Sequence, residues 1–93
     1  MHKYASEFIG TFILVLAILV ASNDATKPLY IGLTLIAAII IVSGLGGVAH
    51  LNPVVTMVQV QRGQCPTETA SVLVLMQLLG AAAATMLVPY AER

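Results

Sequence analysis

Two adjacent residues in the middle of this sequence combine helix-starting chemistry with an apolar setting. Asn52 is followed directly by Pro53, and both lie in the stretch GVAHLNPVVT, residues 47–56. An asparagine side chain caps free backbone N–H groups, and proline suits the first helical position because it needs no hydrogen-bond partner there. The pair therefore predicts a helix that begins at Pro53. The N-terminus of such a helix repels cations and offers hydrogen-bond donors to a lone pair.

This predicted helix is too short to cross a membrane. It ends near Gln61 and Arg62, whose polar side chains suit a helix C-terminus and water. About ten residues at a rise of ~1.5 Å reach ~15 Å, half the thickness of a bilayer core. A non-spanning stretch at membrane depth is tolerated only where its backbone is buried in protein or lines a wet cavity. We therefore predict a re-entrant loop and half-helix over about 44–61.

The composition of the chain is typical of a membrane protein. Of the 93 residues, 59% are hydrophobic and 9% are charged, and the mean hydropathy is +0.98. Such a chain cannot cover a core with polar surface, so we expect a lipid bilayer around it. The four basic and four acidic side chains cancel, which excludes a basic tract for nucleic acid. We predict an integral membrane protein that binds no nucleic acid.

The sequence carries no pattern of catalytic or metal-binding residues. It contains no Ser, His and Asp set, no carboxylate pair, no phosphate-binding loop and no metal-spaced ligands. Cys65 is the one cysteine, which excludes an intrachain disulfide and a cysteine metal cluster. We therefore predict that the chain is not an enzyme and that it binds no cofactor and no metal.

Three apolar segments surround the short helix. They run over about 4–21, 29–43 and 68–88, and the polar stretches SNDATKP and RGQCPTE separate them from their neighbours. The first segment also has the basic start and apolar run of a signal peptide, but two further apolar segments favour its retention. Thr67 is the expected N-cap of the last segment. The sequence predicts one all-α membrane domain over 1–93, with three transmembrane helices and one re-entrant half-helix.

Polar and small residues inside these segments indicate close contacts. Gln77 lies in the third segment, where a polar group in lipid is expected to find an interior partner. Gly44 and Gly47 end the second segment and let the chain bend into the re-entrant loop. We therefore expect Gln77, Gly44 and Gly47 to support that loop.

Three stretches together resemble a known family. EFIGTFILV, SGLGGVAHLNPVVT and MQLLGAAAA are similar, in this order, to the first half of an aquaporin or glycerol facilitator, the major intrinsic protein family. The resemblance covers nearly the whole chain, and the Asn-Pro box is its most specific part. It implies three spanning helices and a half-helix that carries Asn-Pro-Ala. In that family two inverted halves meet, half-helix to half-helix, at the centre of an hourglass pore.

The resemblance assigns roles to the residues of the box. It implies that Asn52 donates its amide to a water or polyol oxygen that passes in single file, and that Pro53 fixes the half-helix. Val54 replaces the usual alanine of the box, where the two half-helices touch. His50 matches a histidine at the pore vestibule. A histidine two residues before a cap also serves to tie down loop carbonyls, and both interpretations of His50 stay open.

Other matched positions bear on support and selectivity. Glu7 corresponds to a glutamate of the first helix that accepts backbone N–H groups of the re-entrant loop, although a solvated glutamate at a helix end is the alternative. Second halves of the family carry a filter arginine directly after the box, where this chain has Val55. A second filter position lies near Ile31 or Gly32, and neither is aromatic. The resemblance therefore implies a less polar filter that passes water and small neutral solutes such as glycerol.

One half-helix leaves a pore unfinished, so another half is expected. An identical chain inserted upside down would supply it, as would a partner chain. Lys3 and Arg62 are expected on one side of the membrane and Lys27 and Arg93 on the other, which gives no preferred orientation. We predict antiparallel homodimers, and eight chains if four pores gather as in the family. A non-conducting subunit that packs in a larger assembly, and a designed or truncated half of a longer channel, are the alternatives.

Overall fold

The computed structural model describes residues 2–89, and all of its regular structure in this range is helical. Four helices follow in order: α1 (His2–Val20), α2 (Lys27–Gly44), α3 (Pro53–Gln61) and α4 (Thr67–Leu87). The helices α1, α2 and α4 are each long and apolar enough to cross a membrane. The nine residues of α3 reach only ~14 Å. The predicted fold, half of an aquaporin with three spanning helices and one short helix, is confirmed.

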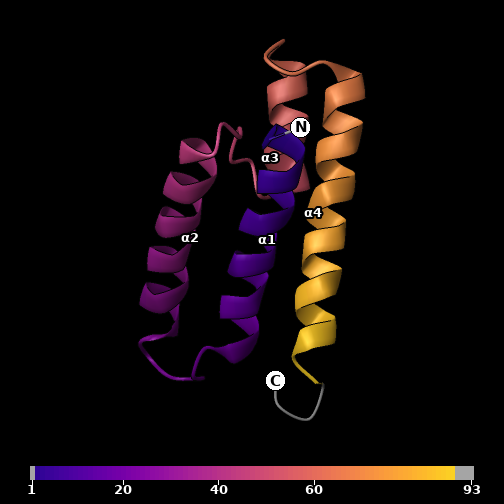
Figure 1. The fold of residues 1–93 in the computed structure, drawn as a ribbon. Coiled ribbons are helices and arrows are strands. Elements are labelled where there is room, and N and C mark those ends of the chain that lie inside the picture. Colours follow the sequence, from indigo (N-terminus) through magenta and orange to yellow (C-terminus); the bar gives the residue numbers. More distant parts are fainter. Residues whose placement is uncertain (1, 90–93) are drawn as a thin grey trace.

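The three long helices lie side by side with α1 in the middle. Figure 1 shows α2 and α4 on opposite sides of α1, and the short α3 behind the half of α1 that contains its N-terminus. The helix α1 packs against both α2 and α4, while α3 packs against α4. This arrangement carries the N-terminus of α3 to the middle of the 39 Å long molecule. The start of the short helix therefore lies between the two ends of the long helices.

The helix bounds differ by one or two residues from the predicted ranges of 4–21, 29–43 and 68–88. The predicted capping by Thr67 is wrong, because Thr67 is itself the first residue of α4. Pro66 precedes it with φ −63° and ψ 149°, an extended conformation that proline favours, and no side chain caps this end. The backbone carbonyl of Thr67 instead accepts a hydrogen bond from Ser71 Oγ.

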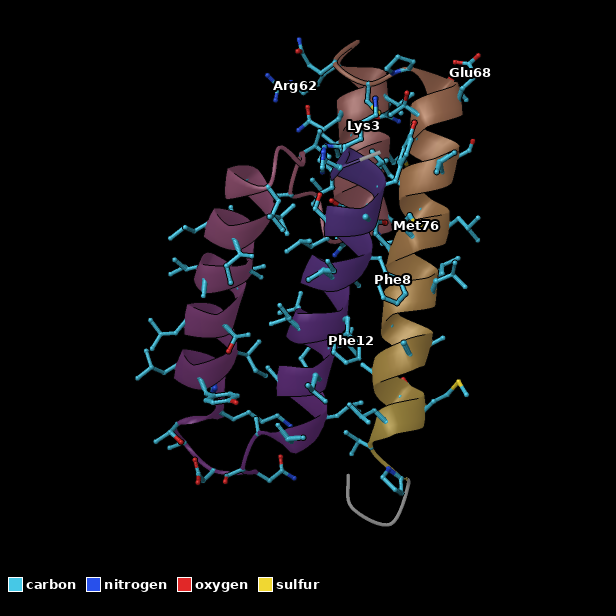
Figure 2. All side chains as sticks on the ribbon, in the orientation of Figure 1. Lys3, Phe8, Phe12, Arg62, Glu68 and Met76 are labelled. Atoms are coloured by element: carbon cyan, nitrogen blue, oxygen red, sulfur yellow. The ribbon has the colours of Figure 1, made fainter. Side chains whose placement is uncertain are left out.

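Small residues allow α1 and α4 to approach closely. A Cβ atom added to Gly80 would lie 2.5 Å from the carbonyl oxygen of Phe8 and 3.1 Å from the amide nitrogen of Phe12. Figure 2 shows the side chains of Phe8 and Phe12 extending from α1 toward α4. On α2, by contrast, residues such as Leu33 and Ile40 are exposed. That surface suits lipid contact, whereas α1 forms the centre of the packing.

A short polar turn joins α1 to α2 at the end of the molecule opposite Lys3 and Arg62 (Figures 1 and 2). Asp24 Oδ1 accepts hydrogen bonds from the hydroxyl of Thr26, at 2.5 Å, and from its backbone N–H, at 2.8 Å. These two bonds, the hydroxyl first, lower the pKa of the Asp24 carboxyl below its ordinary value of 3.8. The turn thus favours the ionised carboxylate.

Candidate functional site

The N-terminus of α3 is capped by Asn52. This residue has an extended backbone with φ −157° and ψ 129°, and its Oδ1 accepts a hydrogen bond of 2.8 Å from the backbone N–H of Val54. Pro53 follows as the first helical residue. Because the side-chain oxygen is occupied by the cap, the amide Nδ2 group is left to donate. It makes no hydrogen bond to any residue in the range 2–89, and Asn52 is exposed.

The loop before Asn52 holds an unusual backbone. Ala49 and Leu51 adopt φ values of 55° and 58°, which lie in the left-handed region that side chains other than glycine disfavour. The backbone N–H of Leu51 donates a short hydrogen bond to Oε1 of Glu7. Gly47 lies so close to α1 and α2 that an added Cβ would collide with Ser6 Oγ and Val42 Cγ1. Contacts with the helices therefore hold the loop in this conformation.

A buried hydrogen-bond network connects this loop to α1, α3 and α4. Gln77 Nε2 donates to Oε1 of Glu7 and to Oγ1 of Thr56, both at 2.9 Å. Thr56 Oγ1 also lies 2.9 Å from Nδ1 of His50. Glu7 is 0%, Thr56 1% and Gln77 2% exposed, so the network is shielded from solvent. If the Gln77 amide were reversed, its oxygen would face the Glu7 carboxylate, and two acceptors would meet without a hydrogen between them. The orientation with Nε2 toward Glu7 is therefore the one that forms hydrogen bonds.

Three oxygens beside this network are buried without a hydrogen-bond partner among the described residues. They are Oε2 of Glu7, Oε1 of Gln77 and Oγ1 of Thr11. The Gln77 nitrogen already gives its two hydrogens to Glu7 and Thr56. Glu7 Oε2 and Gln77 Oε1 are acceptors only, whereas the Thr11 hydroxyl can both donate and accept.

A groove runs past the start of α3. It encloses about 300 Å³ and is lined by Leu14, Leu35, Ile39, Ala49, His50, Leu51, Asn52 and Val55. A second cavity of about 200 Å³ is also lined by His50, together with Lys3, Gln59 and other residues near the end of α3. The residues that line the groove are mainly apolar, and Asn52 and His50 are the two polar residues among them. Such a surface suits small neutral molecules that accept hydrogen bonds.

The structure brings some of the predicted site residues together and leaves others apart. Asn52, His50 and Val55 line the one groove. Pro53 instead lines a cavity of about 420 Å³ between α3 and α4, and Val54 is 63% exposed. Neither is among the residues that line the groove.

The remaining predicted positions lie farther from the groove. Ile31 and Gly32 lie near the start of α2, and neither is among the residues that line the groove. Gly44 is the last residue of α2, and an added Cβ would meet nothing within 4 Å. Glu7 and Gln77 lie behind the groove, in the buried network. Close approach at the loop is therefore a property of Gly47 rather than Gly44.

Sequence reasoning missed Thr56 and Leu51. Thr56 joins His50 to Gln77, and the backbone N–H of Leu51 joins the loop to Glu7. Thr56 is the only hydroxyl-bearing residue in the short helix PVVTMVQVQ, which was the available signal. The backbone role of Leu51 leaves no trace in its residue type.

The residues of the site do not form a metal centre. Within residues 2–89, no group of three or more His, Cys, Asp or Glu side chains could hold a metal ion. Cys65 is buried and has no disulfide partner. The groove is lined by apolar residues together with Asn52 and His50.

Comparison with known proteins agrees with this arrangement. The family model described as major intrinsic protein matches residues 1–92. A search of curated proteins and a search of solved structures gave no match. The family match covers nearly the whole chain, and the fold is half of an aquaporin. The chain is therefore an integral membrane protein and belongs to the major intrinsic protein family, which consists of membrane channels of the aquaporin and glycerol-facilitator type.

Proposed function

We propose that this chain forms one half of a passive channel for water and small neutral solutes such as glycerol, and that an inverted second copy completes the pore. The groove beside the N-terminus of α3 carries this proposal. Asn52, whose amide nitrogen makes no hydrogen bond to residues 2–89, lines this groove together with apolar residues of α1 and α2. The oxygen of a solute could accept a hydrogen bond from this amide, which would replace part of the hydration that the solute loses. The carbon atoms of the same solute would contact the apolar residues of the groove.

Cation exclusion follows from the direction of α3. Its N-terminus, with the positive end of the helix dipole, lies at the mouth of the groove. Asn52 lines the same groove, and its amide nitrogen is available to donate because the cap uses Oδ1. A cation at this point would meet a positive dipole end and donor hydrogens. Neutral molecules with lone pairs meet no such barrier.

An inverted copy would cover the open side of the groove. The start of α3 is exposed at Asn52, Pro53 and Val54. In a half-channel that spans the membrane, this start would lie near the centre of the bilayer. Polar groups and a helix terminus at that depth need protein or a wet cavity around them. A twofold axis in the membrane plane would bring the two α3 N-termini together and enclose one pore between two grooves.

The charge distribution is compatible with insertion in both orientations. Lys3 and Arg62 lie at one end of the molecule (Figure 2), and Lys27 begins α2 at the other. Arg93, which was expected beside Lys27, lies outside the described residues. Small differences in Lys and Arg number between the two sides give a weak orientation signal.

The filter of the paired channel would be apolar. Val55 lines the groove at the position where second halves of the family carry arginine. In a homodimer both copies would present valine there. Ile31 and Gly32 add no aromatic constriction. Such a filter would pass glycerol as well as water.

The test is stopped-flow osmotic shrinkage of liposomes that contain only the purified chain. We expect fast water and glycerol flow with a low activation energy. Asn52→Asp keeps the capping oxygen but replaces the donor amide with an anionic oxygen, so it should reduce both rates. Asn23→Asp makes the same change in the exposed turn before α2 and is the matched control. Flow equal to that of empty liposomes would refute pore completion by the chain itself, and exclusion of glycerol would refute the filter.

A further inference from the structure

We propose that Thr56 is a positioning residue that holds neutral His50 with its hydrogen on Nε2, so that the ring presents a second hydrogen-bond donor beside Asn52. The tautomer follows from the hydrogen bonds around Thr56 alone. Its consequence for solute selection rests on the proposed channel function.

The first step concerns the direction of the bond from Gln77. An amide nitrogen donates and does not accept, so Gln77 Nε2 must donate to Thr56 Oγ1 across their 2.9 Å. The second hydrogen of Gln77 Nε2 is held by Oε1 of Glu7. Thr56 Oγ1 therefore acts as an acceptor toward α4. Its own hydrogen must go to another neighbour.

The second step decides where the Thr56 hydroxyl hydrogen goes. Two atoms lie within reach of the hydroxyl: His50 Nδ1 at 2.9 Å, which accepts only in the tautomer that carries its hydrogen on Nε2, and the backbone carbonyl oxygen of Asn52 at 3.4 Å. Good hydroxyl bonds are about 2.7–2.8 Å long, so the carbonyl is poorly placed. That carbonyl also accepts the backbone N–H of Thr56 at 3.1 Å. The hydroxyl therefore donates to Nδ1, and the hydrogen of the neutral imidazole lies on Nε2.

The third step concerns the free nitrogen of the ring. His50 Nε2 makes no hydrogen bond to any residue between 2 and 89, and His50 lines both the groove and the adjoining cavity that is also lined by Lys3. The amide of Asn52 is the other free donor of the groove. The groove would thus offer two neutral donors and favour molecules with several lone pairs, such as polyols. A ring with the opposite tautomer would offer an acceptor instead.

The groups that set this tautomer do not line the groove. Glu7, Thr56 and Gln77 belong to α1, α3 and α4, and each is at most 2% exposed. Burial fixes their rotamers, so the direction of every bond in the network is set before a solute arrives. A solute in the groove therefore meets a ring of defined polarity.

Nitrogen-15 NMR of histidine-labelled chain in lipid tests the tautomer directly. The spectrum is recorded in mildly alkaline buffer. We expect His50 to show an unprotonated Nδ1 and a protonated Nε2. His2 is the other histidine of the chain and is removed from the spectrum by His2→Gln. A protonated Nδ1 on His50 in the wild-type chain would overturn the proposal.

Variants connect the tautomer to transport. Thr56→Val removes the hydroxyl, so the two tautomers should become mixed and glycerol permeability should fall roughly fivefold, the effect of losing one hydrogen bond. Thr56→Ser should restore both readouts. Thr34→Val, which removes a hydroxyl bonded to the Tyr30 carbonyl on α2, is the matched control. A Thr56→Val chain with an unchanged His50 spectrum would refute the positioning role. The expected wild-type spectrum without any permeability would refute the channel function instead.

Discussion

Gln77 in α4 donates a hydrogen bond of 2.9 Å from Nε2 to Oε1 of Glu7 in α1, across 70 positions of sequence. The same carboxylate oxygen accepts the backbone N–H of Leu51. One buried atom therefore ties the loop before α3 to the packed pair α1 and α4. The left-handed conformation of Leu51 persists because these contacts hold it. The network thus supports the backbone immediately before Asn52.

Removal of the Glu7 carboxylate should destabilise the fold. Glu7→Ala leaves the N–H of Leu51 and one hydrogen of Gln77 Nε2 buried without an acceptor. Each such donor costs about 1–3 kcal/mol, so we expect the free energy of unfolding to fall by roughly 3 kcal/mol. Glu7→Gln retains an acceptor oxygen and should cost less than about 1 kcal/mol. Helicity during SDS titration measures both, and equal losses in the two variants would contradict this role.

The close contact of α1 and α4 predicts opposite effects for two glycines. A Cβ at Gly80 would lie 2.5 Å from the backbone oxygen of Phe8, so Gly80→Ala should force the helices apart and cost about 1–3 kcal/mol. At Gly32 nothing lies within 4 Å of an added Cβ. Gly32→Ala should therefore be neutral or stabilise α2 by about 0.5–1 kcal/mol. The same SDS titration compares them, and equal stability of the two variants would count against the contact.

Local chemistry made the short helix predictable from sequence. The cap joins Asn52 to Val54, two positions away, and Pro53 marks the first helical residue. The membrane fold was predictable for the same reason. Each apolar run that indicates a spanning helix is a local feature of one segment of the sequence. The role of Asn52 in conduction remains a prediction, since its cap alone does not test it.

Long-range contacts could not be predicted in the same way. An interior partner was expected for Gln77, but Thr56 and Glu7 lie 21 and 70 positions from it. The positive φ of Ala49 and Leu51 contradicts the preference of their residue types. These features arise only when the folded chain brings α1 and α2 against the loop and α4 against α1. The missed start of α4 was a different error, because a threonine after proline suits either the cap or the first turn.

Val55 should control the size of solute that passes. Because Val55 lines the groove, Val55→Phe would narrow a paired pore twice, once from each copy. We expect glycerol permeability to fall roughly tenfold or more, equivalent to an added barrier of about 1.4 kcal/mol, with a smaller loss for water. Val58→Phe on the same helix, outside the residues that line the groove, is the control. Stopped-flow light scattering measures both solutes. Unchanged glycerol flow in Val55→Phe would exclude Val55 from the pore wall.

The turn before α2 should lose its order in acid. Hydrogen bonds from Thr26 lower the pKa of Asp24 in the folded chain below 3.8. The stability that these hydrogen bonds give the folded turn is therefore fully present above pH 3.8. It is lost as the pH falls through the lower pKa that Asp24 has in the folded chain. Thr26→Val removes the larger cause and should raise the pKa partway toward 3.8. An NMR titration of the Asp24 carboxyl measures this, and an unchanged pKa in Thr26→Val would contradict the assignment.

Disulfide cross-linking tests the inverted pair most directly. In a Cys65→Ser chain, Val54→Cys places a thiol at the exposed start of α3, near the middle of the membrane. A twofold axis in the membrane plane would bring two such thiols together, and a disulfide requires Cα atoms within about 7 Å. Met86→Cys places the thiol near the end of α4, at an 85% exposed position. In an inverted pair, the two thiols of this variant would lie at opposite faces of the membrane.

We predict that oxidation in liposomes joins Val54→Cys chains into dimers that still conduct water, while Met86→Cys chains remain monomers. Cross-linking of Met86→Cys without cross-linking of Val54→Cys would show a parallel association and contradict the inverted pore.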